Sequence, residues 1–349
     1  MRVLILYTEL AGYVLGNFKR FLDLNPDAEL LVVHYPVNPE APFNFDSYKG
    51  AKFIVFDKTK AENQAQELLK FKPDVVLCSG WGNKIYIDWV KALDKKVKRV
   101  ICFDNQWKGT VKQRILSVIS SLTFLKMFKY AWVPGEPQKQ YALKLGFKES
   151  NVFTGLYPAD TELFIPIGKK KLSEKGVYPK VMLSVARYIP QKDLPTMWQA
   201  FISANQVTGE KWSMQCIGFG DLFEQRIQHP SISHLGFKQP SEIESYVLTS
   251  GVYVLPSVYE PWGVAVHEMA LCALPLVLSD KVGAASMFLK QENGFSFKAG
   301  DQSGLTEIFT RIMRMKDEEL WAMSEASYQS GMQLSSNHWA GTMSKILND

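Results

Sequence analysis

The stretch 251–270, GVYVLPSVYEPWGVAVHEMA, joins an apolar run to a helical segment through a Pro-Trp-Gly bend. The run 251–257 is almost wholly apolar, which predicts a buried strand. Gly263 allows a close backbone approach in the bend, and we expect a helix from there through Ala270. A buried strand that leads directly into a helix is typical of parallel sheets covered by helices. The stretch therefore predicts an α/β fold, with the carboxylates Glu260 and Glu268 on either side of the bend.

The same alternation of strand and helix patterns runs along the whole chain. Candidate strands in the first half are 2–7, 29–35, 52–57, 73–80, 98–104, 130–135 and 151–156, and those in the second half are 181–186, 212–218, 232–237, 251–257 and 274–280. Between the halves, 157–180 carries three prolines and three adjacent lysines without a clear period, which is typical of a linker. We predict two doubly wound, Rossmann-like domains that face each other across a cleft: an N-terminal domain 1–165 and a C-terminal domain 166–334.

The composition, 46% hydrophobic and 21% charged residues, is ordinary for a soluble globular protein. No run of eighteen apolar residues occurs, so we expect no transmembrane helix, and residues 1–10 indicate a first strand and not a signal peptide. The net charge of +5 comes partly from 94–99 and 168–176, which indicate solvated surface or weak attraction to anionic lipid or an acidic substrate. Four dispersed cysteines suggest reduced core residues in a cytosolic protein, and neither they nor the five histidines have metal-ligand spacing.

Two cations follow the first strand of the second half. Arg187 and Lys192 lie in the segment that leaves 181–186, and Asp193 is a candidate N-cap for the helix that comes next. Arg can hold a diphosphate by a forked contact and Lys as a point charge. The alternative is an ordinary basic surface loop.

The two carboxylates of the opening stretch need a different partner. A helix N-terminus attracts an anion such as a phosphate, but Glu260 and Glu268 would repel one. Sugar hydroxyls suit them, because an ionised carboxylate accepts hydrogen bonds from two vicinal OH groups. We therefore expect Glu260 near a transferring sugar and Glu268 near a ribose, unless Glu268 only caps or pairs locally.

Several motifs of the second half occur in the order found in one enzyme family. They are SVARYIPQKDLPTMWQAF (184–201), IGFGD (217–221), the block 235–288 with its two glutamates seven residues apart, and ENGFSFKAGD (292–301). Together they resemble glycosyltransferase family 4, which has the GT-B fold and an E-x7-E element. The resemblance covers about 181–301 and, more loosely, 131–164.

The resemblance implies a retaining enzyme whose C-terminal domain holds a nucleotide-sugar donor, with no cofactor. Arg187 and Lys192 would bind the diphosphate, Glu260 would face the donor sugar, and Glu268 would hold the ribose hydroxyls. The catalytic set would be Glu260, Arg187 and Lys192. The backbone of Gly263 and Val264 would lie near the sugar and the phosphates, and Gly12 would approach the donor phosphate. The family also implies that the terminal helices, 317–347, pack across the domain junction, with about 335–349 returning to the first domain.

The chemistry of glycosyl transfer agrees with this interpretation. Negative charge develops on the departing diphosphate, and fixed cations and helix N–H groups can stabilise it without a metal. No Asp-x-Asp triplet occurs in the chain, which favours metal-independent transfer from a UDP- or GDP-sugar. The acceptor would be a glycan or lipid-linked glycan, in surface polysaccharide or glycolipid synthesis. Alternatives are a nucleotide-sugar epimerase or hydrolase on the same fold, or a non-catalytic nucleotide-sugar binding protein.

The N-terminal half departs from the family pattern. Many members carry a His after the strand equivalent to 98–104, where this chain reads FDNQWKG. Asp104 or Asn105 would take the sugar-contacting role, and Trp107 would stack on an acceptor sugar. The segment 111–132 has an apolar centre with basic ends; it indicates either an interfacial helix, with the protein peripheral at the inner face of a membrane, or a buried domain helix.

Overall fold

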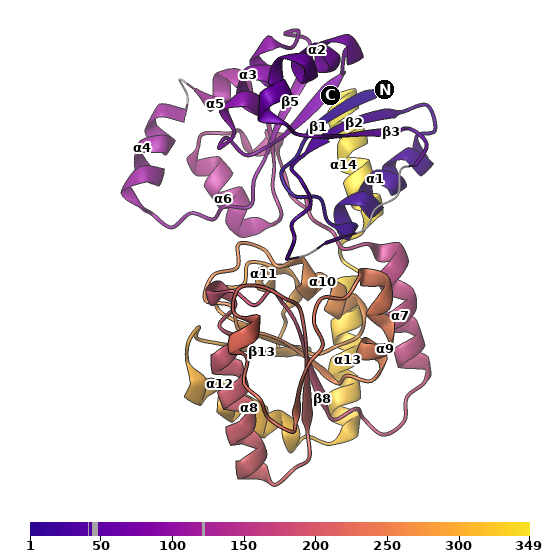
Figure 1. Cartoon of the computed structure of the whole chain (residues 1–349), viewed down its shortest axis with the longest axis vertical. Helices are drawn as coiled ribbons and strands as arrows, with labels where there is room; N and C mark the ends of the chain where they lie inside the picture. Colours follow the sequence, from indigo (N-terminus) through magenta and orange to yellow (C-terminus); the bar gives the residue numbers. More distant parts are fainter. Residues whose placement is uncertain (41, 44–47, 121–122) are drawn as a thin grey trace. The chain divides into compact units, whose positions relative to one another are not determined.

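A computed structural model describes residues 1–40, 42–43, 48–120 and 123–349. The chain forms two compact units. Unit 1 comprises Met1–Asn38, Phe43–Pro158 and Ser335–Asp349, and unit 2 comprises Pro39–Pro42 and Ala159–Leu334. Each unit is a parallel sheet covered by helices, which confirms the predicted α/β class with two Rossmann-like domains (Figure 1).

The sheet of unit 1 is entirely parallel, in the order β3-β2-β1-β4-β5-β6-β7. Its strands are β1 (Arg2–Leu6), β2 (Glu29–His34), β3 (Ala51–Val55), β4 (Val75–Ser79), β5 (Lys98–Cys102), β6 (Tyr130–Trp132) and β7 (Val152–Phe153). Alternate residues of β1 pack on opposite faces, Val3 and Ile5 in one core and Leu4 and Leu6 in another. Both faces are therefore buried, as expected for near-continuous apolar strands.

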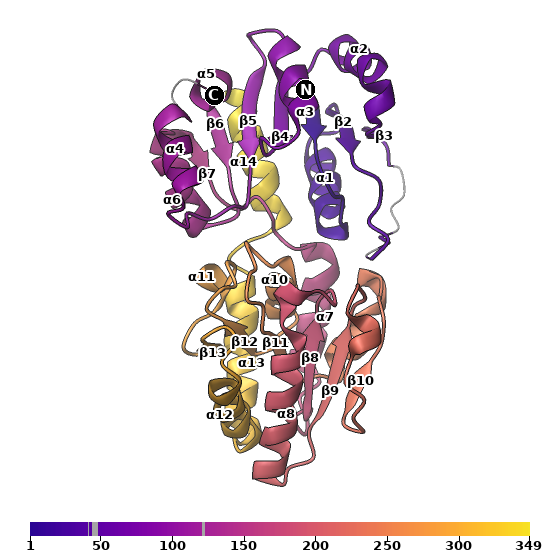
Figure 2. The same cartoon turned by 60° about the vertical axis from the view of Figure 1, so that its left-hand side comes forward.

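Helices from both ends of the chain cover unit 1. They are α1 (Gly12–Leu24), α2 (Ala61–Phe71), α3 (Lys84–Ala92), α4 (Val111–Ile119), α5 (Phe124–Met127), α6 (Glu136–Lys144) and α14 (Ser336–Asn348), with 3-10 turns η1 (Lys58–Lys60) and η3 (Glu149–Asn151). Helix α14 lies beside α1 (Figure 2). Trp339 of α14 meets the rings of Phe18 and Trp132 at centroid distances of 5.6 and 5.0 Å. This aromatic contact ties the last helix of the chain to unit 1.

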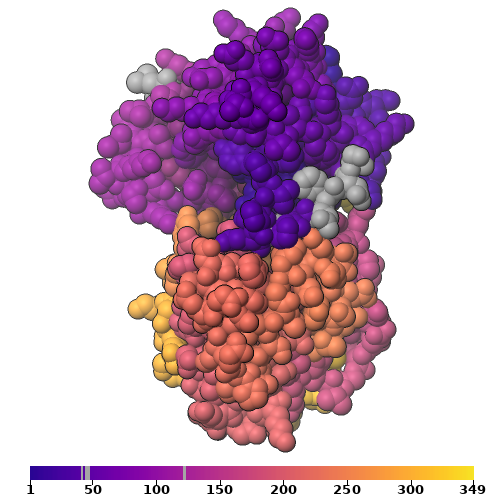
Figure 3. Space-filling model, in the orientation of Figure 1, coloured from indigo at the N-terminus to yellow at the C-terminus, as the bar shows by residue number. Residues whose placement is uncertain are grey.

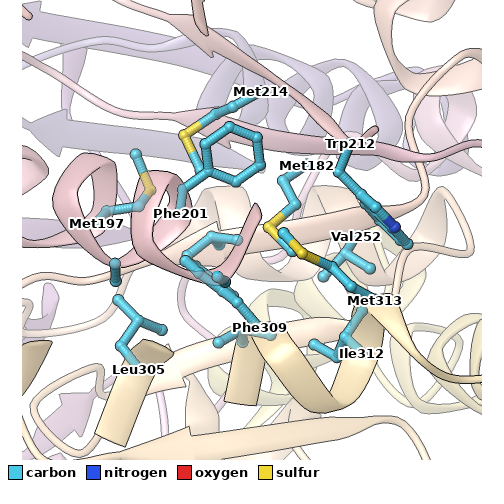
Figure 4. Packing of buried hydrophobic residues seen from close by; sticks show 14 of the residues in the cluster. Met182, Met197, Phe201, Trp212, Met214, Val252, Leu305, Phe309, Ile312 and Met313 are labelled. Carbon is cyan, nitrogen blue, oxygen red and sulfur yellow. The ribbon is translucent and has the colours of Figure 1, made fainter. Parts of the chain in front are cut away.

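Unit 2 has a second all-parallel sheet, in the order β10-β9-β8-β11-β12-β13. The strands are β8 (Val181–Val185), β9 (Ser213–Ile217), β10 (Ile232–His234), β11 (Val252–Leu255), β12 (Leu276–Ser279) and β13 (Gly294–Phe297). The helices are α7 (Thr161–Ser173), α8 (Leu194–Thr208), α9 (Glu244–Leu248), α10 (Val264–Leu271), α11 (Ala285–Phe288), α12 (Gln302–Met313) and α13 (Asp317–Gly331), with 3-10 turns η4 (Pro190–Lys192), η5 (Phe223–Gln225) and η6 (Pro240–Glu242). Phe201 of α8 and Phe309 of α12 pack together with Met182 and Met214 from the sheet (Figure 4).

The stretch predicted to be a linker is mostly helical, so that prediction was wrong. Helix α7 begins at Thr161 because the Asp160 carboxylate accepts hydrogen bonds from the backbone N–H groups of Glu162 and Leu163. The helix continues through Pro166 and buries Phe164 among other residues. The division between the units accordingly falls at Pro158–Ala159 and not near residue 165.

The segment 111–132 is not one buried helix, as one of the two interpretations had it. Helix α4 ends at Ile119, α5 spans Phe124–Met127, and residues 130–132 form strand β6. None of the side chains of α4 is fully buried. Of the two terminal helices, α13 lies in unit 2 and only α14 in unit 1. Within the described residues, no helix is both long and apolar enough to cross a membrane.

Candidate functional site

The candidate site of unit 2 lies where its strand order reverses. Strand β8 pairs with β9 on one side and with β11 on the other, and all three run parallel. The connections that leave the carboxyl ends of β8 and β11 therefore start side by side and lead away on opposite sides of the sheet. Such a switch point is where open parallel sheets bind ligands. The connections are residues 186–193 and 256–263, and they carry four of the predicted site residues: Arg187, Lys192, Glu260 and Gly263.

The connection after β8 is held by backbone bonds and ends in a strained residue. Asp193 has φ of 46° at the start of α8, and its carboxylate accepts a hydrogen bond from the Thr196 hydroxyl. It occupies the predicted N-cap position. The Gln191 carbonyl accepts a 2.9 Å hydrogen bond from the N–H of Val258, which fastens this connection to the one after β11.

The Gly-x-Gly turn after β9 supports the backbone around Arg187. Gly218 and Gly220 have φ of 145° and 149°. A Cβ on Gly218 would lie 1.9 Å from the Ala186 carbonyl oxygen, so only glycine fits there. The N–H of Tyr188 donates to the Phe219 carbonyl between the two glycines at 2.9 Å. The turn therefore serves to position the loop that carries Arg187.

The connection after β11 is fixed to the one after β12. The Glu260 N–H donates to the Lys281 carbonyl at 3.2 Å, and the Gly283 N–H donates to the Glu260 carbonyl at 3.0 Å. Gly263 precedes α10 with φ of 93°, and a Cβ there would lie 3.0 Å from Cγ of Glu260. The predicted bend and helix are both confirmed, and the glycine is required both by its φ and by the side chain folded back beneath it.

Lys192 and Glu260 form an ion pair between the two connections. Their side chains are only 15% and 13% exposed, so the pair is largely shielded from water. The Ser257 hydroxyl lies 3.4 Å from the same carboxylate oxygen of Glu260. The structure thus brings together two residues that sequence analysis had assigned to different parts of a ligand.

Glu268 lies within α10 and is partly buried. Burial, together with the nearby charge of Asp160, raises the pKa of its carboxyl from the ordinary 4.5 to about 7. Among the described residues, its carboxylate has no hydrogen-bond partner. Both Glu260 and Glu268 also raise the pKa of the buried Tyr253 phenol, after the larger effect of burial. The two carboxylates therefore both act on the phenol of Tyr253, a residue of β11.

Arg187 is more exposed than the ion pair. Its side chain is 42% exposed, and Nη1 lies 3.3 Å from the Glu40 carboxylate. Glu40 belongs to the short segment Pro39–Pro42 that groups with unit 2. The guanidinium is thus held loosely by one carboxylate while it remains open to solvent.

His267, next to Glu268, is part of the scaffold. Its Nδ1 accepts a hydrogen bond from the Ala159 N–H, and its Nε2 donates to the Gly331 carbonyl, both at 2.9 Å. The ring is fully buried, and burial lowers its pKa from 6.5 to about 4. The neutral ring therefore joins α10 to Ala159, which precedes α7, and to Gly331, the last residue of α13.

The remaining predicted residues belong to unit 1. Gly12 begins α1, and Asn105 is exposed in the segment after β5. The Asp104 carbonyl accepts a bond from the Gln138 side chain. Trp107 packs against Tyr141 at 5.6 Å, so part of its ring is covered. Their roles at a donor or acceptor stay predictions.

Four residues of the site escaped sequence analysis. Tyr253 of β11 and Ser257 just after it belong to the apolar run 251–257 and carry no motif, and Gln191 takes part through its backbone. Asp160 was included in the supposed linker, yet its charge acts on Glu268. Only the strand order could have indicated them.

Comparison with known proteins shows what this site and this fold are similar to. Residues 169–330, which include the whole candidate site of unit 2 except Glu40 and Asp160, match the family model of Glycosyl transferases group 1. In overall structure the chain is similar to a glycosyltransferase from Rickettsia africae, with 13% identity, TM-score 0.71, and coverage of 99% of this chain and 97% of that one. It is equally similar to Anabaena HepE, solved in complex with UDP and glucose, with 14% identity, TM-score 0.70 and 99% of both chains covered. The fold is therefore that of the GT-B glycosyltransferases.

Sequence similarity is confined to part of the chain. The amylovoran biosynthesis glycosyltransferase AmsK of Erwinia amylovora is 28% identical over 155 residues, which are 41% of this chain and 38% of that protein. The matches span less than two fifths of the length of each of the curated relatives. The part of the chain that matches the family model, 169–330, lies within unit 2 and covers less than half of the chain.

Proposed function

We propose that this chain is a retaining, metal-independent glycosyltransferase. It would move a sugar from a UDP- or GDP-sugar to a glycan or a lipid-linked glycan. The observation that carries the proposal is the shielded Lys192–Glu260 pair at the switch point of a parallel sheet, together with the Glu268 carboxylate, which has no hydrogen-bond partner among the described residues. This arrangement offers a cation for a phosphate and two carboxylates for hydroxyl groups.

The ion pair suits a ligand that carries both phosphates and hydroxyls. A diphosphate that approaches Lys192 can share its ammonium with Glu260, because an ammonium has three donors. Glu260 then accepts hydrogen bonds from hydroxyls of the donor sugar. Arg187, which is loosely held by Glu40, supplies a second cation with forked geometry. The amino end of α10, which starts at Val264, adds backbone N–H groups and the positive end of its dipole.

The same groups account for the chemistry of transfer. As the glycosidic bond breaks, negative charge moves onto the departing diphosphate, and positive charge builds on the sugar ring. The negative charge on the diphosphate is stabilised by Lys192, Arg187 and the start of α10. The positive charge on the sugar ring is stabilised by the carboxylate of Glu260. Because the cations stand in place before the reaction, they need no reorganisation as the charge develops.

Glu268 suits the ribose of the donor. Its carboxylate is partly buried without a hydrogen-bond partner among the described residues, and two vicinal hydroxyls can satisfy it. Such contacts favour the ionised form, so nucleotide binding should lower the pKa of this group. The comparisons support a nucleoside diphosphate donor, since HepE was solved with UDP and glucose.

The first test is thermal stabilisation by UDP, GDP, ADP and CMP in the presence of EDTA. A ligand that binds only the folded state stabilises it by about 2.7 kcal/mol at a hundred times its dissociation constant. We expect one nucleoside diphosphate to stabilise the wild type and Lys211→Ala, an exposed lysine elsewhere in unit 2, but not Lys192→Ala. Equal stabilisation of all three proteins would reject the donor site.

The second test concerns the reaction. The donor identified by stabilisation is incubated in EDTA with and without glycan acceptors, and the anomeric proton of the product is followed by NMR. Transfer with the donor's anomeric configuration retained is expected, and Glu260→Gln should slow it more than it weakens nucleotide binding. Conversion of the donor at the same rate without an acceptor would instead indicate an epimerase or a hydrolase.

A further inference from the structure

Helix α4 exposes an apolar stripe on the surface of unit 1. Val111, Ile115, Val118 and Ile119 are 73%, 56%, 75% and 41% exposed. They recur at positions i, i+4, i+7 and i+8, so they share one side of the helix. Among the described residues, no other helix carries more than one exposed large apolar side chain. The segment with this stripe forms the outer edge of unit 1, drawn in magenta in Figure 3.

The opposite side of α4 attaches it to the unit. Leu116 packs against the core, and the Gln113 side chain accepts from the Lys108 N–H at 2.7 Å and donates to the Gln106 carbonyl at 2.7 Å. At about 100° per residue, Lys112 and Arg114 fall on the two flanks of the apolar stripe. An apolar stripe with basic flanks is the pattern of a helix that lies in a lipid interface.

A strongly basic pocket lies close by in the chain. It has a volume of about 660 Å³ and is lined by Leu125–Tyr130 from α5 and β6, by the segment that precedes β5, and by 146–148. No acidic side chain is among its lining residues. Four exposed lysines at its wall, Lys95, Lys96, Lys126 and Lys148, form no ion pair among the described residues.

Three further cations of the pocket already have partners. Lys98 donates to the Leu347 carbonyl, Arg99 donates to the Leu93 carbonyl, and Lys129 pairs with Asp349. These bonds fix the wall of the pocket, whereas the four unpaired lysines keep their charge for a ligand. Several lysines around one open pocket attract anions with more than one charge.

The basic pocket lies at the wrong edge of the sheet for the donor or the acceptor. Its residues around β5 and β6 either precede these strands or are their first residues, so they lie at the amino ends of the strands. Substrates of parallel sheets bind at the carboxyl ends. The pocket therefore calls for a ligand other than those of the transfer reaction.

A second pocket adjoins the basic pocket. It measures about 550 Å³ and is lined by Trp81, Ile87, Phe124 and Met127, with Lys84, Asp88, Lys91 and Thr123 as its other lining residues. Met127 lines both pockets. Helices α4 and α5 lie on the same side of unit 1 in both views (Figures 1 and 2).

We propose that unit 1 docks on an anionic phospholipid membrane through the apolar stripe of α4 and the basic pocket. The stripe would enter the boundary between headgroups and acyl chains, while the lysines of the pocket hold lipid phosphates. Charge complementarity selects this occupant, because a membrane with anionic lipids offers apolar and anionic groups side by side. A soluble polyanion would leave the stripe without a partner. This docking goes beyond sugar transfer and does not depend on it.

The proposal is tested by sedimentation of the full chain with vesicles at about 0.1 M salt. Vesicles of phosphatidylcholine are compared with vesicles that contain about one third phosphatidylglycerol. We expect at least about tenfold tighter binding to the anionic vesicles. The triple variant Val111→Ser, Ile115→Ser, Val118→Ser should lose about tenfold or more, whereas Val177→Ser, Val207→Ser, exposed apolar positions of unit 2, should bind as the wild type.

A second set of variants tests the basic pocket. Each lysine near an anionic surface contributes about fivefold in affinity, so Lys95→Gln, Lys96→Gln, Lys126→Gln together should weaken binding about a hundredfold. The matched triple Lys169→Gln, Lys211→Gln, Lys290→Gln, exposed lysines of unit 2, should not change it beyond a few-fold. Both sets should keep the thermal midpoint and the nucleotide response, so failure of docking and failure of the donor site are distinguished.

Three outcomes would overturn the proposal. The first is no sedimentation with anionic vesicles, and the second is equal loss in the control variants. The third is binding of soluble dextran sulfate that depends on the pocket lysines, together with vesicle binding that is indifferent to the α4 variant. That last result would make the pocket a site for a soluble polyanion.

Discussion

Replacement of Glu268 by Gln should make the folded protein more stable while it weakens nucleotide binding. The pKa of Glu268 is about 7 in the folded chain, against an ordinary value of 4.5, because burial disfavours its charge. At pH 8 the carboxyl is ionised in both the folded and the unfolded state. A gap of about 2.5 between the two pKa values then costs at most about 3 kcal/mol of folding stability. Gln has nearly the same shape and no charge, so this cost disappears.

The pH dependence gives the sign of the effect. As the pH falls through 7 toward 4.5, the folded state takes up a proton before the unfolded state does, and the cost in the wild type declines. At pH 5 it is about 1 kcal/mol. The advantage of Glu268→Gln should therefore be largest at pH 8 and should shrink by about 2 kcal/mol at pH 5.

The assay is the thermal midpoint of the two proteins at pH 8 and at pH 5. For a unit of this size, 1 kcal/mol corresponds to about 2–4 °C, so the variant should unfold up to about 6–12 °C higher at pH 8. His267 titrates identically in both proteins, and its contribution cancels from the difference. A midpoint difference that is the same at both pH values, or a variant less stable than the wild type at pH 8, would refute the argument that Glu268 is destabilised by burial.

Three further predictions concern the same site. If ribose hydroxyls need the ionised carboxylate, nucleotide affinity should fall about tenfold between pH 8 and pH 6 in the wild type and stay level in Glu268→Gln, as titration calorimetry would show. In the Glu268→Gln background, protonation of His267 should reduce the free energy of unfolding by about 2 kcal/mol from pH 7 to pH 5. The cause is that its folded pKa of about 4 lies below the ordinary 6.5, so the unfolded state takes up the proton first. Chemical denaturation at both pH values measures this change, and the same free energy of unfolding at both would contradict the prediction. Gly263→Ala should lower the free energy of unfolding by about 1–3 kcal/mol and abolish transfer, because φ of 93° and Cγ of Glu260 both oppose a side chain there. The control Gly209→Ala, at a position with φ of 67° and open space around it, should leave transfer intact. An active Gly263→Ala variant would show that the bend tolerates a side chain.

The alternation of strands and helices could be predicted because it depends on local patterns. Apolar runs such as 251–257 signal buried parallel strands whatever lies elsewhere in the chain. Helix α7 escaped prediction because its local signals oppose a helix. Pro166 and the adjacent lysines suggest a linker, but Asp160 caps the helix, and Lys171 donates to the carbonyl of Ser250. The contacts that stabilise α7 are tertiary, and the segment alone does not reveal them.

The contact between Lys192 and Glu260 could not be predicted from the sequence either, because it is also a tertiary contact. The two residues were each predicted to belong to the site, yet 68 positions separate them. They meet because β8 and β11 are neighbours, and the strand order became known only with the fold. Motif spacing along the chain indicates which residues serve a ligand, but the pairing between those residues follows from the sheet topology.

Two adjacent residues of α10 show how burial separates a structural role from a functional one. His267 and Glu268 have both lost water, and in both cases burial is the largest cause of the shifted pKa. His267 recovers the loss through two hydrogen bonds, to the Ala159 N–H and the Gly331 carbonyl, so it stabilises the fold. The Glu268 carboxylate receives no hydrogen bond from the described residues to replace its lost hydration, and the charge of Asp160 repels it. A carboxylate kept at such a cost is explained when a ligand supplies the missing hydrogen bonds, and this is why we assign Glu268, and not His267, to the donor.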